Sequence, residues 1–339
     1  MNIQKGTSLF GLNTFGMKAT IAQLAKATSL EDVQSILEYQ YKNKMPLFIL
    51  GGGSNILFTK DVEALVLLNR LKGISVREQN EDYVWVEACA GENWHQFVQH
   101  CIQQNWGGME NLSLIPGNVG ASPMQNIGAY GVEIKDVFHS LEAVRLRDGQ
   151  VREFSAEECR FGYRESIFKQ EEKGNWLISK VTYRLTRKNH VLKTEYGAIL
   201  SELEKMKITH PDIQSISKAV IQIRQSKLPD PAEIGNAGSF FKNPVIELEL
   251  LENIKLNHPD CVNYPAGEGK VKLAAGWLIE KAGWKGYRKG DAGVHKNQAL
   301  VLVNYGHAKG DEIASLADQI IEDILIKFGV KLEKEVNIY

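Results

Sequence analysis

Hydrophobic and polar positions in the first 70 residues predict one helix followed by two strands. Ser29 can cap a helix through its side-chain oxygen, and apolar residues recur at helical spacing from position 30 to 37. The short apolar runs 47–50 and 64–69 suit buried strands. Together these segments predict a compact lobe of helix and strand that ends near residue 70.

Residues 71–228 are predicted to form a second lobe that is rich in strands. The segments with strand-like patterns are 83–88, 141–146, 151–154 and 181–185. Asp148-Gly149 lies between two of them and is a dipeptide typical of hairpin turns. Residues 197–226 have helical spacing, and Pro211 restarts that pattern.

A proline-rich boundary at 228–231 precedes a third unit. This unit contains a strand-like run at 300–303 and a helical pattern from about 311 to 328. We therefore expect an α+β fold. The expected domains are 1–70, 71–228 and 229–328, with a C-terminal tail at 329–339.

Composition and charge exclude several classes of protein. The 339 residues carry a net charge of −1, so the basic excess of a general nucleic-acid binder is absent. The N-terminus lacks the apolar segment of a signal peptide, and no run approaches the ~20 apolar residues of a membrane helix. The four cysteines lack metal-ligand spacing and predict reduced, packed thiols without a metal site. These features favour a cytoplasmic protein.

A glycine loop, Gly51-Gly52-Gly53-Ser54-Asn55, follows the predicted buried strand directly. Successive N–H groups without side chains can form a concave nest for an anion such as pyrophosphate. The loop matches neither a dinucleotide fingerprint, because Ile56 replaces a glycine, nor a phosphate-binding P-loop. A tight turn that needs positive φ angles is the alternative.

A second glycine-rich loop spans residues 115–131. Its glycines allow close approach of a ligand, its apolar side chains suit a flat ring, and Gln125 and Asn126 supply donors and acceptors. A structured Ω-loop without a ligand is the alternative. Two such loops favour a large ligand with a pyrophosphate and a ring system, and a flavin dinucleotide fits better than NAD.

Three polar residues are candidates for chemistry, each with a plainer alternative. Ser239 follows a glycine-rich arm, but Phe241 rules against a hydrolase nucleophile elbow, so it is a hydroxyl donor, a substrate contact or a plain loop serine. Arg164 suits a carboxylate ligand or a surface pair with Glu165. Glu335 suits a catalytic acid or an ordinary charged tail.

Five motifs together resemble the UDP-N-acetylenolpyruvoylglucosamine reductase family, also called UDP-N-acetylmuramate dehydrogenases. They span Ile115–Gly131, Cys159–Lys169, Ser226–Pro231, Gly235–Pro244 and Lys272–Glu280. The resemblance extends from Asn13 to Glu335. It implies a two-lobed FAD-binding unit of the vanillyl-alcohol-oxidase type (1–70 and 71–228), plus a smaller α/β substrate-binding domain. It also implies the long subclass, in which a tyrosine such as Tyr196 lies on a loop that closes over substrate.

The resemblance also implies roles for individual residues. Ser239 would donate a proton to C2 of the substrate, while Arg164 and Glu335 would stand at its carboxylate. The implied cofactor-binding residues are Gly51, Gly52, Gly53, Ser54, Asn55, Ile115, Gly117, Gly120, Ser122, Ile127, Gly128, Tyr163 and Arg224. The implied substrate-binding residues are Tyr196, Lys227, Asn243 and Gln298. One departure is Lys334, where relatives often have proline.

The implied activity is NADPH-dependent reduction of an enolpyruvyl sugar nucleotide through FAD, in bacterial peptidoglycan synthesis. FAD is expected to be non-covalent, because Gly51–Asn55 contains no histidine to attach it. We expect a cytoplasmic monomer that binds a small-molecule substrate but neither nucleic acid nor membrane. A flavin oxidase that reduces oxygen, and a nucleotide-sugar binding module without turnover, are the competing classes.

Overall fold

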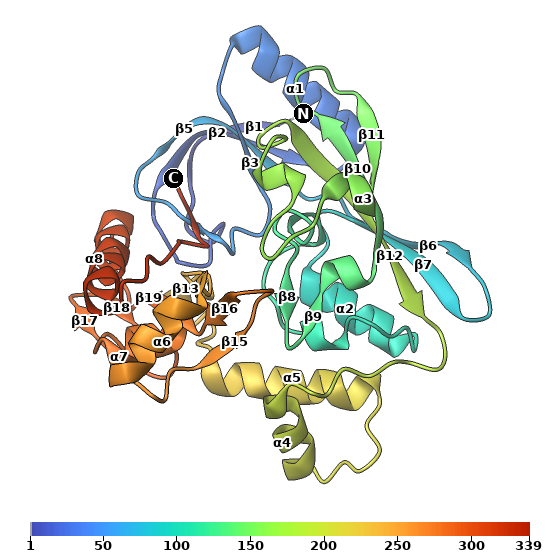
Figure 1. Cartoon of the computed structure of the whole chain (residues 1–339). Coiled ribbons are helices and arrows are strands. Elements are labelled where there is room, and N and C mark those ends of the chain that lie inside the picture. The colour runs from blue at the N-terminus through green and yellow to red at the C-terminus, as the bar shows by residue number, and fades with distance from the viewer. Residues whose placement is uncertain (1) are drawn as a thin grey trace. The chain divides into compact units, whose positions relative to one another are not determined.

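The computed structural model describes residues 2–339, and contacts within the chain divide it into two units (Figure 1). Unit 1 consists of the chain up to Thr7, Ile21–Gly52 and Val62–Ser226. Unit 2 consists of Ser8–Thr20, Gly53–Asp61 and Lys227–Tyr339. Helices together with separate parallel and antiparallel sheets confirm the α+β class.

This division differs from the predicted domains in two respects. Unit 2 resumes at Lys227, close to the predicted boundary after residue 228, and the segments on either side of residue 70 both belong to unit 1. Ser8–Thr20 and Gly53–Asp61 join the C-terminal unit through hydrogen bonds to residues far along the chain. For example, Asn236 N donates to Thr14 O at 3.0 Å, and Thr59 N donates to Tyr339 O at 2.8 Å. Local hydrophobic patterns do not report such pairings.

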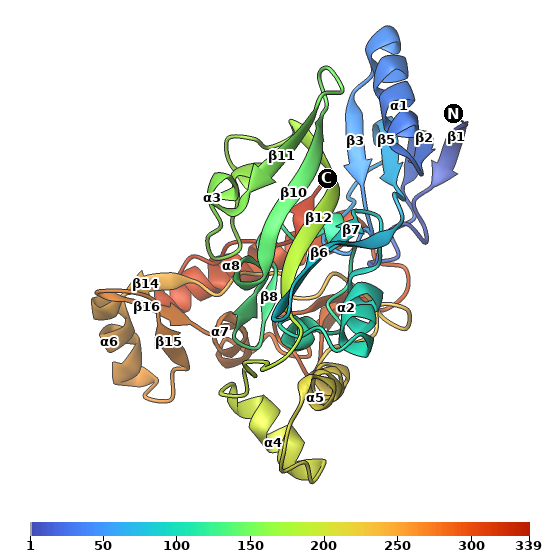
Figure 2. The same cartoon turned by 90° about the vertical axis from the view of Figure 1, so that its right-hand side faces the viewer.

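Unit 1 contains a four-stranded sheet beside a helix. The sheet order is β1 (Ile3–Ser8), β2 (Thr20–Ala27), β5 (Val62–Asn69) and β3 (Leu47–Leu50), and β5 pairs in parallel with both β2 and β3. Helix α1 (Leu30–Asn43) connects β2 to β3 (Figure 2). The predicted Ser29 cap is confirmed, because its hydroxyl accepts a hydrogen bond from Asp32 N at 3.2 Å.

A five-stranded antiparallel sheet forms the other part of unit 1. Its order is β11 (Val151–Ser155), β10 (Phe138–Arg145), β12 (Trp176–Thr186), β7 (Tyr83–Cys89) and β6 (Ile74–Gln79). Asp148-Gly149 makes the predicted turn between β10 and β11, with Gly149 at φ 72°. Buried Tyr183 of β12 packs against the rings of Trp94 and Phe97, with ring centroids 5.9 and 5.3 Å away.

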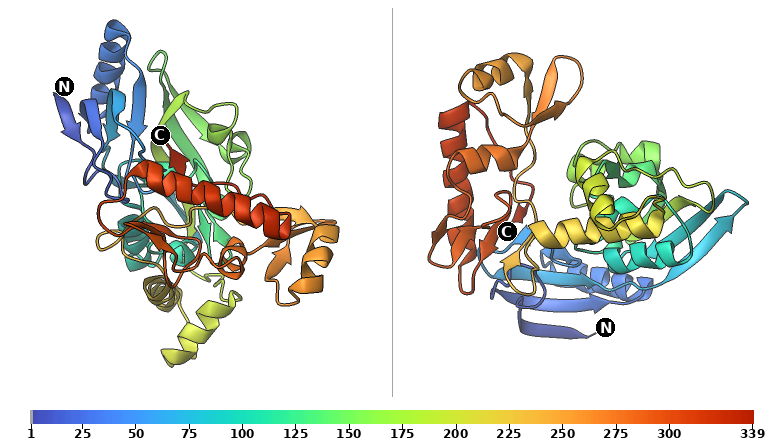
Figure 3. Two further views of the ribbon diagram at one scale, coloured as in Figure 1. Left: turned by 90° about the vertical axis from the view of Figure 1, so that its left-hand side faces the viewer. Right: turned by 90° about the horizontal axis from the view of Figure 1, so that it is seen from below.

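The remaining elements of unit 1 are short, apart from its helices. Helix α5 (Ile213–Lys227, its last residue in unit 2) lies beside α2 (Trp94–Gln103) in Figure 3, and Gln99 Nε2 donates to Ser217 Oγ at 2.9 Å. Other elements of this unit include β8 (Gly128–Ala129), β9 (Val132–Glu133), α3 (Ala156–Cys159) and α4 (Gly197–Lys205). The helical prediction for 197–226 is therefore confirmed as two helices, with Pro211 between them.

Unit 2 contains three small sheets and three helices. The first sheet has the order β13 (Gly235–Asn236), β19 (Leu302–Asn304), β18 (Ala292–Val294) and β17 (Arg288–Lys289). The second has the order β14 (Val245–Glu247), β16 (Lys270–Leu273) and β15 (Asn263–Pro265). The third pairs β20 (Asn337–Ile338) with β4 (Ile56–Leu57). The helices are α6 (Leu248–Asn257), α7 (Ala275–Lys281) and α8 (Gly310–Phe328). Helix α8 contacts β18 and β19, and its end at Phe328 matches the prediction. No helix within residues 2–339 combines the length and apolarity needed to cross a membrane.

Candidate active site

The two predicted glycine loops contact each other within unit 1. A Cβ atom built on Gly52 would lie 3.1 Å from Gly117 Cα and 2.9 Å from Asn118 Oδ1. Such distances are shorter than ordinary van der Waals contact, so the loops touch backbone to backbone. By contrast, a Cβ on Gly51 would meet nothing within 4 Å. The carbonyl oxygen of Gly51 accepts a hydrogen bond from Arg70 Nη1 at 2.9 Å.

The first glycine loop presents consecutive amide donors. Within residues 2–339, the N–H groups of Gly52, Gly53 and Ser54 donate no hydrogen bond. Gly53 has φ 63°, and a Cβ there would lie 2.0 Å from Leu12 O, so only glycine fits. Successive unpaired amides are the components of an anion-binding nest.

The second loop, residues 115–131, is held rigidly by its own polar side chains. Buried Asn126 donates through Nδ2 to Gly162 O at 2.9 Å and to Glu133 at 3.0 Å, and its Oδ1 accepts from Lys135 N at 3.1 Å. Ser122 is also buried, and its hydroxyl contacts Val119 O and the Tyr183 hydroxyl.

These contacts show where two polar side chains of that loop point. Asn126 was expected to offer its amide to a ligand, but its donor and acceptor atoms are engaged inside the protein. The hydroxyl of Ser122 likewise faces the core rather than the loop surface. Both side chains fix the shape of the loop, because buried polar groups need internal partners.

Glycine also sets how the second loop lies on the rest of unit 1. A Cβ on Gly120 would be 2.5 Å from the Cβ of Ala90, and Gly120 N donates to Ala90 O at 3.0 Å. Gly117 has φ 112°, a conformation that favours glycine. Ile115 and Ile127 are half-buried and pack against the hydrophobic core. The loop is therefore ordered by close packing and retains apolar side chains at its surface.

Arg224 holds the peptide that enters this loop. Its Nε donates to Leu114 O at 3.2 Å, while Leu114 N donates to His95 Nδ1 at 2.9 Å. Leu114 has φ 59°, which is uncommon for a residue with a side chain. Burial lowers the pKa of His95, and the nearby charge of Arg224 lowers it further. A neutral imidazole with a free Nδ1 lone pair is the form that accepts this bond.

No sequence pattern points to His95 or Leu114. A histidine beside a predicted loop has many plain explanations, and a positive φ at leucine has no compositional signal. Arg224 was named only through the family resemblance.

Arg164 lies in a tight turn and reaches the second glycine loop. Glu165 N and Gly162 O are 3.3 Å apart across the turn, and Arg164 itself has φ 55°. Its Nη2 donates to Gly128 O at 2.8 Å, and its guanidinium lies 5.4 Å from the centre of the Tyr163 ring. Unit 1 thus brings together Arg164, Tyr163 and Gly128 of the predicted site.

Tyr196 belongs to the segment that precedes α4. Its ring meets Tyr130 edge to face, with centroids 5.4 Å apart. Asn111 Nδ2 donates to both Tyr130 O and Lys193 O, each at 2.9 Å. This segment is therefore attached to the end of the second glycine loop. Tyr196 is about half exposed (47%), so its ring has surface left for a ligand.

Ser239 stands at the end of a braced arm in unit 2. Before it, Gly238 N donates to Asn236 Oδ1 at 2.9 Å, and Gly238 has φ 70°. After it, Phe240 and Phe241 are fully buried, and Phe240 N donates to Leu300 O at 2.8 Å. The serine is itself exposed. Anchors on both sides therefore present a solvent-facing hydroxyl from a fixed backbone.

Glu335 is attached to this same arm. Glu335 N donates to Phe240 O at 2.8 Å, and Lys334 faces Phe241 in an antiparallel bridge. On its other side, Asn55 Nδ2 donates to Glu335 O at 3.3 Å across 280 residues of sequence. Strand β20 then pairs with β4, directly after the first glycine loop. The peptide of Glu335 is thus held between the Ser239 arm and Asn55.

Two of the predicted substrate-binding residues each lie near the start of α7. Asn243 Oδ1 accepts from Ala275 N at 3.0 Å. Gln298 Oε1 lies 3.4 Å from the position of a Cβ on Gly276. Lys227 ends α5, is exposed, and forms no hydrogen bond or ion pair with either residue within 2–339.

Comparison with known proteins identifies the family. Residues 230–339 match the family model described as UDP-N-acetylenolpyruvoylglucosamine reductase, C-terminal domain, and residues 21–155 match the model described as FAD binding domain. The chain is 52% identical over 338 residues to UDP-N-acetylenolpyruvoylglucosamine reductase of Flavobacterium johnsoniae, covering 100% of both chains. It is 50% identical to that of Pseudomonas aeruginosa, covering 100% and 99%. This chain belongs to the UDP-N-acetylenolpyruvoylglucosamine reductase family.

The predicted resemblance is thereby confirmed, and a solved structure supports the fold. The crystal structure of UDP-N-acetylenolpyruvylglucosamine reductase from Thermus caldophilus superposes with a TM-score of 0.66. The match covers 100% of this chain and 99% of that one, at 22% identity. An FAD-binding domain followed by the reductase C-terminal domain is therefore the architecture of this family member.

The residues present fit the FAD of this reductase family. The unpaired amides of Gly52, Gly53 and Ser54 suit a pyrophosphate, and Gly52 leaves no room for a side chain between the loops. Loop 115–131 offers apolar surface for a ring. FAD chemistry is thus compatible with the donors and the shape that these loops provide.

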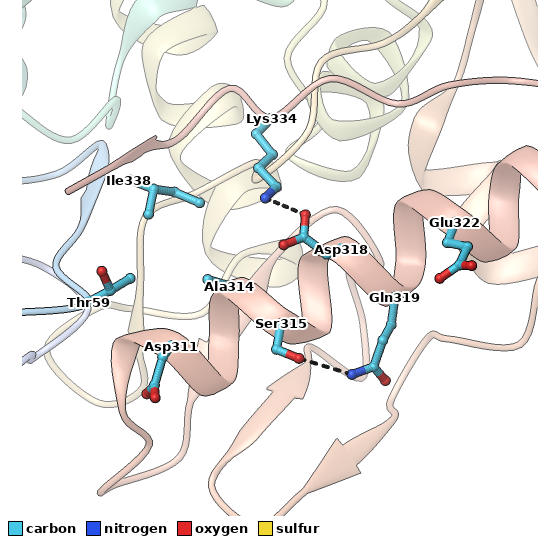
Figure 4. Close-up of a pocket in the computed structure, with 9 residues that line it drawn as sticks. All are labelled: Thr59, Asp311, Ala314, Ser315, Asp318, Gln319, Glu322, Lys334 and Ile338. Carbon is cyan, nitrogen blue, oxygen red and sulfur yellow. Dashed lines mark hydrogen bonds and ion pairs between the residues drawn. The ribbon is translucent and has the colours of Figure 1, made fainter.

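Lys334, the departure from the reductase family pattern, forms an ion pair. Its Nζ lies 2.5 Å from Asp318 Oδ1 of α8, and Figure 4 shows the two side chains pointing toward each other. They line a shallow groove with Thr59, Asp311, Ala314, Ser315, Gln319, Glu322 and Ile338. The groove contains none of the predicted catalytic residues. Lys334 therefore fastens the tail to α8 immediately before Glu335.

Proposed function

We propose that this chain reduces UDP-N-acetylenolpyruvoylglucosamine to UDP-N-acetylmuramate, as an FAD-containing oxidoreductase of bacterial peptidoglycan synthesis with NADPH as electron donor. Full-length identity of 52% to a named reductase and the matched FAD-binding domain support this activity. One geometric observation supports the mechanism: residues 240–242 pair with 333–335, so that Glu335 lies beside the arm of Ser239.

The two glycine loops would hold FAD without a covalent bond. Gly51, Gly52, Gly53, Ser54 and Asn55 would surround the pyrophosphate. The residues that would flank the ring system are Ile115, Gly117, Gly120, Ile127, Gly128 and Tyr163, with Arg224 supporting the loop and Ser122 acting through its backbone. Bound FAD would carry a hydride from NADPH to C3 of the enolpyruvyl group.

Negative charge then develops at C2 and on the substrate carboxylate, as an enolate. Preorganised groups aimed at such charge are often worth ~3–4 kcal/mol each. Arg164 would stabilise the carboxylate with its guanidinium, which Gly128 O and the turn at Gly162 hold in place. Glu335 would assist in its protonated form, because a second anion would raise the barrier.

Ser239 would donate the proton to C2. A hydroxyl is a weak acid, but an enolate is a strong base, so the transfer is matched. Exposure of Ser239 on an arm braced by buried Phe240 and Phe241 supports this role.

Substrate recognition is proposed for the C-terminal domain. Lys227, Asn243 and Gln298 would bind the diphosphate and sugar of the substrate. Tyr196 would lie on a loop that closes over the substrate. We propose residues 1–70 and 71–228 as FAD-binding lobes, 229–328 as the substrate-binding domain and 329–339 as the catalytic tail. The cytoplasmic location, the monomeric state and the lack of nucleic-acid partners stay predictions.

Ser239→Ala tests the mechanism most directly. The variant should bind FAD and accept electrons from NADPH at a near wild-type rate, because the proton belongs to the second half-reaction. Its flavin should then reoxidise with enolpyruvyl substrate ~100- to 10,000-fold more slowly, the usual range for general acid catalysis. Ser239→Cys should retain more activity than Ser239→Ala, since a thiol of pKa ~8.5 still donates a proton.

Ser315→Ala is the matched control, because this serine of α8 also belongs to unit 2 and lines the groove that contains none of the predicted catalytic residues. It should leave both half-reactions unchanged in stopped-flow absorbance. An equal loss of both half-reactions in Ser239→Ala would make the serine structural. Oxygen consumption without the enolpyruvyl sugar would favour an oxidase instead, and failure of NADPH to bleach the flavin would favour a binding module.

A further inference from the structure

Arg70 is a half-buried cation without an acidic partner. It follows β5, and its Nη1 donates to Gly51 O at 2.9 Å and to Asn69 O at 3.0 Å. No carboxylate of residues 2–339 lies within ion-pair distance of it, whereas Lys72, two residues later, pairs with Glu92 at 3.2 Å. Burial lowers the pKa of Arg70, yet a guanidinium remains protonated at neutral pH. Removing a charge from water without a counterion is unfavourable, so its position needs a reason.

The hydrogen bond to Gly51 fixes one peptide of the first glycine loop. In a trans peptide the C=O and the following N–H point in opposite directions. Holding the Gly51 oxygen toward Arg70 therefore aims the Gly52 N–H away from it. That N–H donates no hydrogen bond within residues 2–339 and is free to meet a ligand.

A glycine–glycine peptide needs such a restraint. Glycine populates many backbone conformations, so the Gly51–Gly52 peptide unit would otherwise turn over easily. The turned form would present a carbonyl oxygen, which repels a phosphate, in place of the N–H. Gly117 and Asn118 pack against Gly52 but leave the Gly51 side open, as the empty space around a Cβ on Gly51 indicates. Arg70 is the group that contacts that peptide through its oxygen.

We propose that Arg70 is a positioning residue for the pyrophosphate of FAD, because it holds the Gly51 carbonyl so that the Gly52 N–H faces the phosphate. The inference rests on the FAD binding proposed above. Arg70 acts through the peptide rather than as a direct phosphate ligand. Its positive charge also polarises the bound carbonyl, and hydrogen bonds that run in series strengthen one another.

The experiment compares ligands with and without a diphosphate. Apo-protein carrying Arg70→Met, Arg70→Gln or Arg70→Lys is titrated with FAD, ADP and riboflavin, following flavin fluorescence or competition with FAD. Hydrogen bonds to charged groups contribute enough that Arg70→Met should raise the Kd for FAD and ADP about 10- to 100-fold. Riboflavin, which lacks phosphate, should bind as it does to wild type. Arg70→Gln, a neutral donor, and Arg70→Lys should fall between Arg70→Met and wild type.

Lys72→Met is the control for loss of a nearby positive charge. It should leave all three affinities within about twofold, because Lys72 is exposed and its charge is paired with Glu92. An unchanged Kd for FAD in Arg70→Met would overturn the proposal. An equal loss for riboflavin would also overturn it, since it would make Arg70 a general structural residue. If Arg70→Met fails to fold, the Kd values of Arg70→Gln and Arg70→Lys for FAD, ADP and riboflavin test the proposal in the same way. Absence of FAD binding in wild type would instead contradict the proposed function.

Discussion

Gly51 and Gly52 are neighbours that differ in their tolerance of a side chain. A Cβ on Gly52 would press on Gly117 Cα at 3.1 Å, whereas one on Gly51 would meet open space. Overpacking of this kind typically costs ~1–3 kcal/mol. Gly52→Ala should therefore separate the two loops and weaken FAD binding about 10-fold or more, measured by flavin fluorescence.

Gly51→Ala is the matched control for that prediction. It adds the same methyl group one residue earlier, where a Cβ meets no protein atom, and should weaken FAD binding less than Gly52→Ala does. Equal effects of the two substitutions would mean that glycine is required for backbone freedom throughout the loop, and not for the contact between loops.

His95 predicts a pH dependence of stability. Burial lowers its folded pKa, and the Arg224 charge lowers it further, so the unfolded chain binds the proton more readily. Stability linked to His95 is therefore present above the unfolded pKa of ~6.5 and is lost as the pH falls from there toward the folded pKa. His95→Gln keeps an acceptor for Leu114 N but removes the titration.

Urea unfolding of both proteins between pH 5 and 8 measures this effect. The free energy of unfolding of wild type should fall relative to His95→Gln as the pH drops below ~6.5. His295, whose pKa burial also lowers, is present in both proteins and cancels in the difference. Parallel pH profiles would show that His95 does not titrate differently in the folded and unfolded states.

At the scale of elements, the C-terminal tail is held in unit 2 by backbone pairing. Residues 333–335 pair with the Ser239 arm, and β20 pairs with β4. Deleting residues 335–339 should abolish turnover of the enolpyruvyl sugar while NADPH still reduces the flavin, because the tail serves the second half-reaction. Single-turnover kinetics with each substrate measures the two steps separately.

Glu335→Gln in the full chain separates the carboxyl group from the pairing. It keeps every backbone hydrogen bond of the tail and should lose turnover to nearly the same extent as the deletion. A deletion that kept full turnover would reduce Glu335 to part of an ordinary charged tail. A much milder loss in Glu335→Gln would assign the effect to the pairing itself.

Sequence patterns predicted the long helices and strands well, but they predicted the contacts between distant segments poorly. The strand 47–50, the Ser29 cap and the helix ending at Phe328 are confirmed, because each depends on neighbouring residues. Helices α2 and α6 and the first two strands were not predicted. The assignment of Gly53–Asp61 to unit 2 was also missed, since it depends on contacts with the far end of the chain.

The site shows the same limit at finer scale. The glycine loops were recognisable because an absent side chain has a geometric meaning that sequence alone carries. The sequence does not reveal that the side chains of Asn126 and Ser122 are buried and hydrogen-bonded inside the protein, because a buried polar residue and an exposed one have the same letter. Arg70 had no motif at all, and its relation to Gly51 depends on two adjacent parallel strands, β3 and β5.

At the scale of the whole molecule, retention of flavin is the broadest test. The purified protein should be yellow, because the loops provide amide donors for FAD. The FAD should not be covalently attached, because Gly51–Asn55 contains no histidine that could bond to it. Acid or heat should release all of the flavin into the supernatant, as absorbance at flavin wavelengths would show. Flavin that remained with the precipitated chain would contradict non-covalent binding. Light scattering on the same sample tests the expected monomer.

The pairing of β4 with β20 has a consequence for biosynthesis. The hydrogen-bond partners of Asn55 and Thr59 are Glu335 and Tyr339, which are synthesised 280 residues later. At ~5–20 residues per second, a ribosome needs roughly 15–55 s to make that stretch. Unit 1 is complete once Ser226 has been made, while β4 still lacks its partner strand at the end of the chain. Docking of Glu335 beside the Ser239 arm should therefore be a post-translational event that follows release of the last residues.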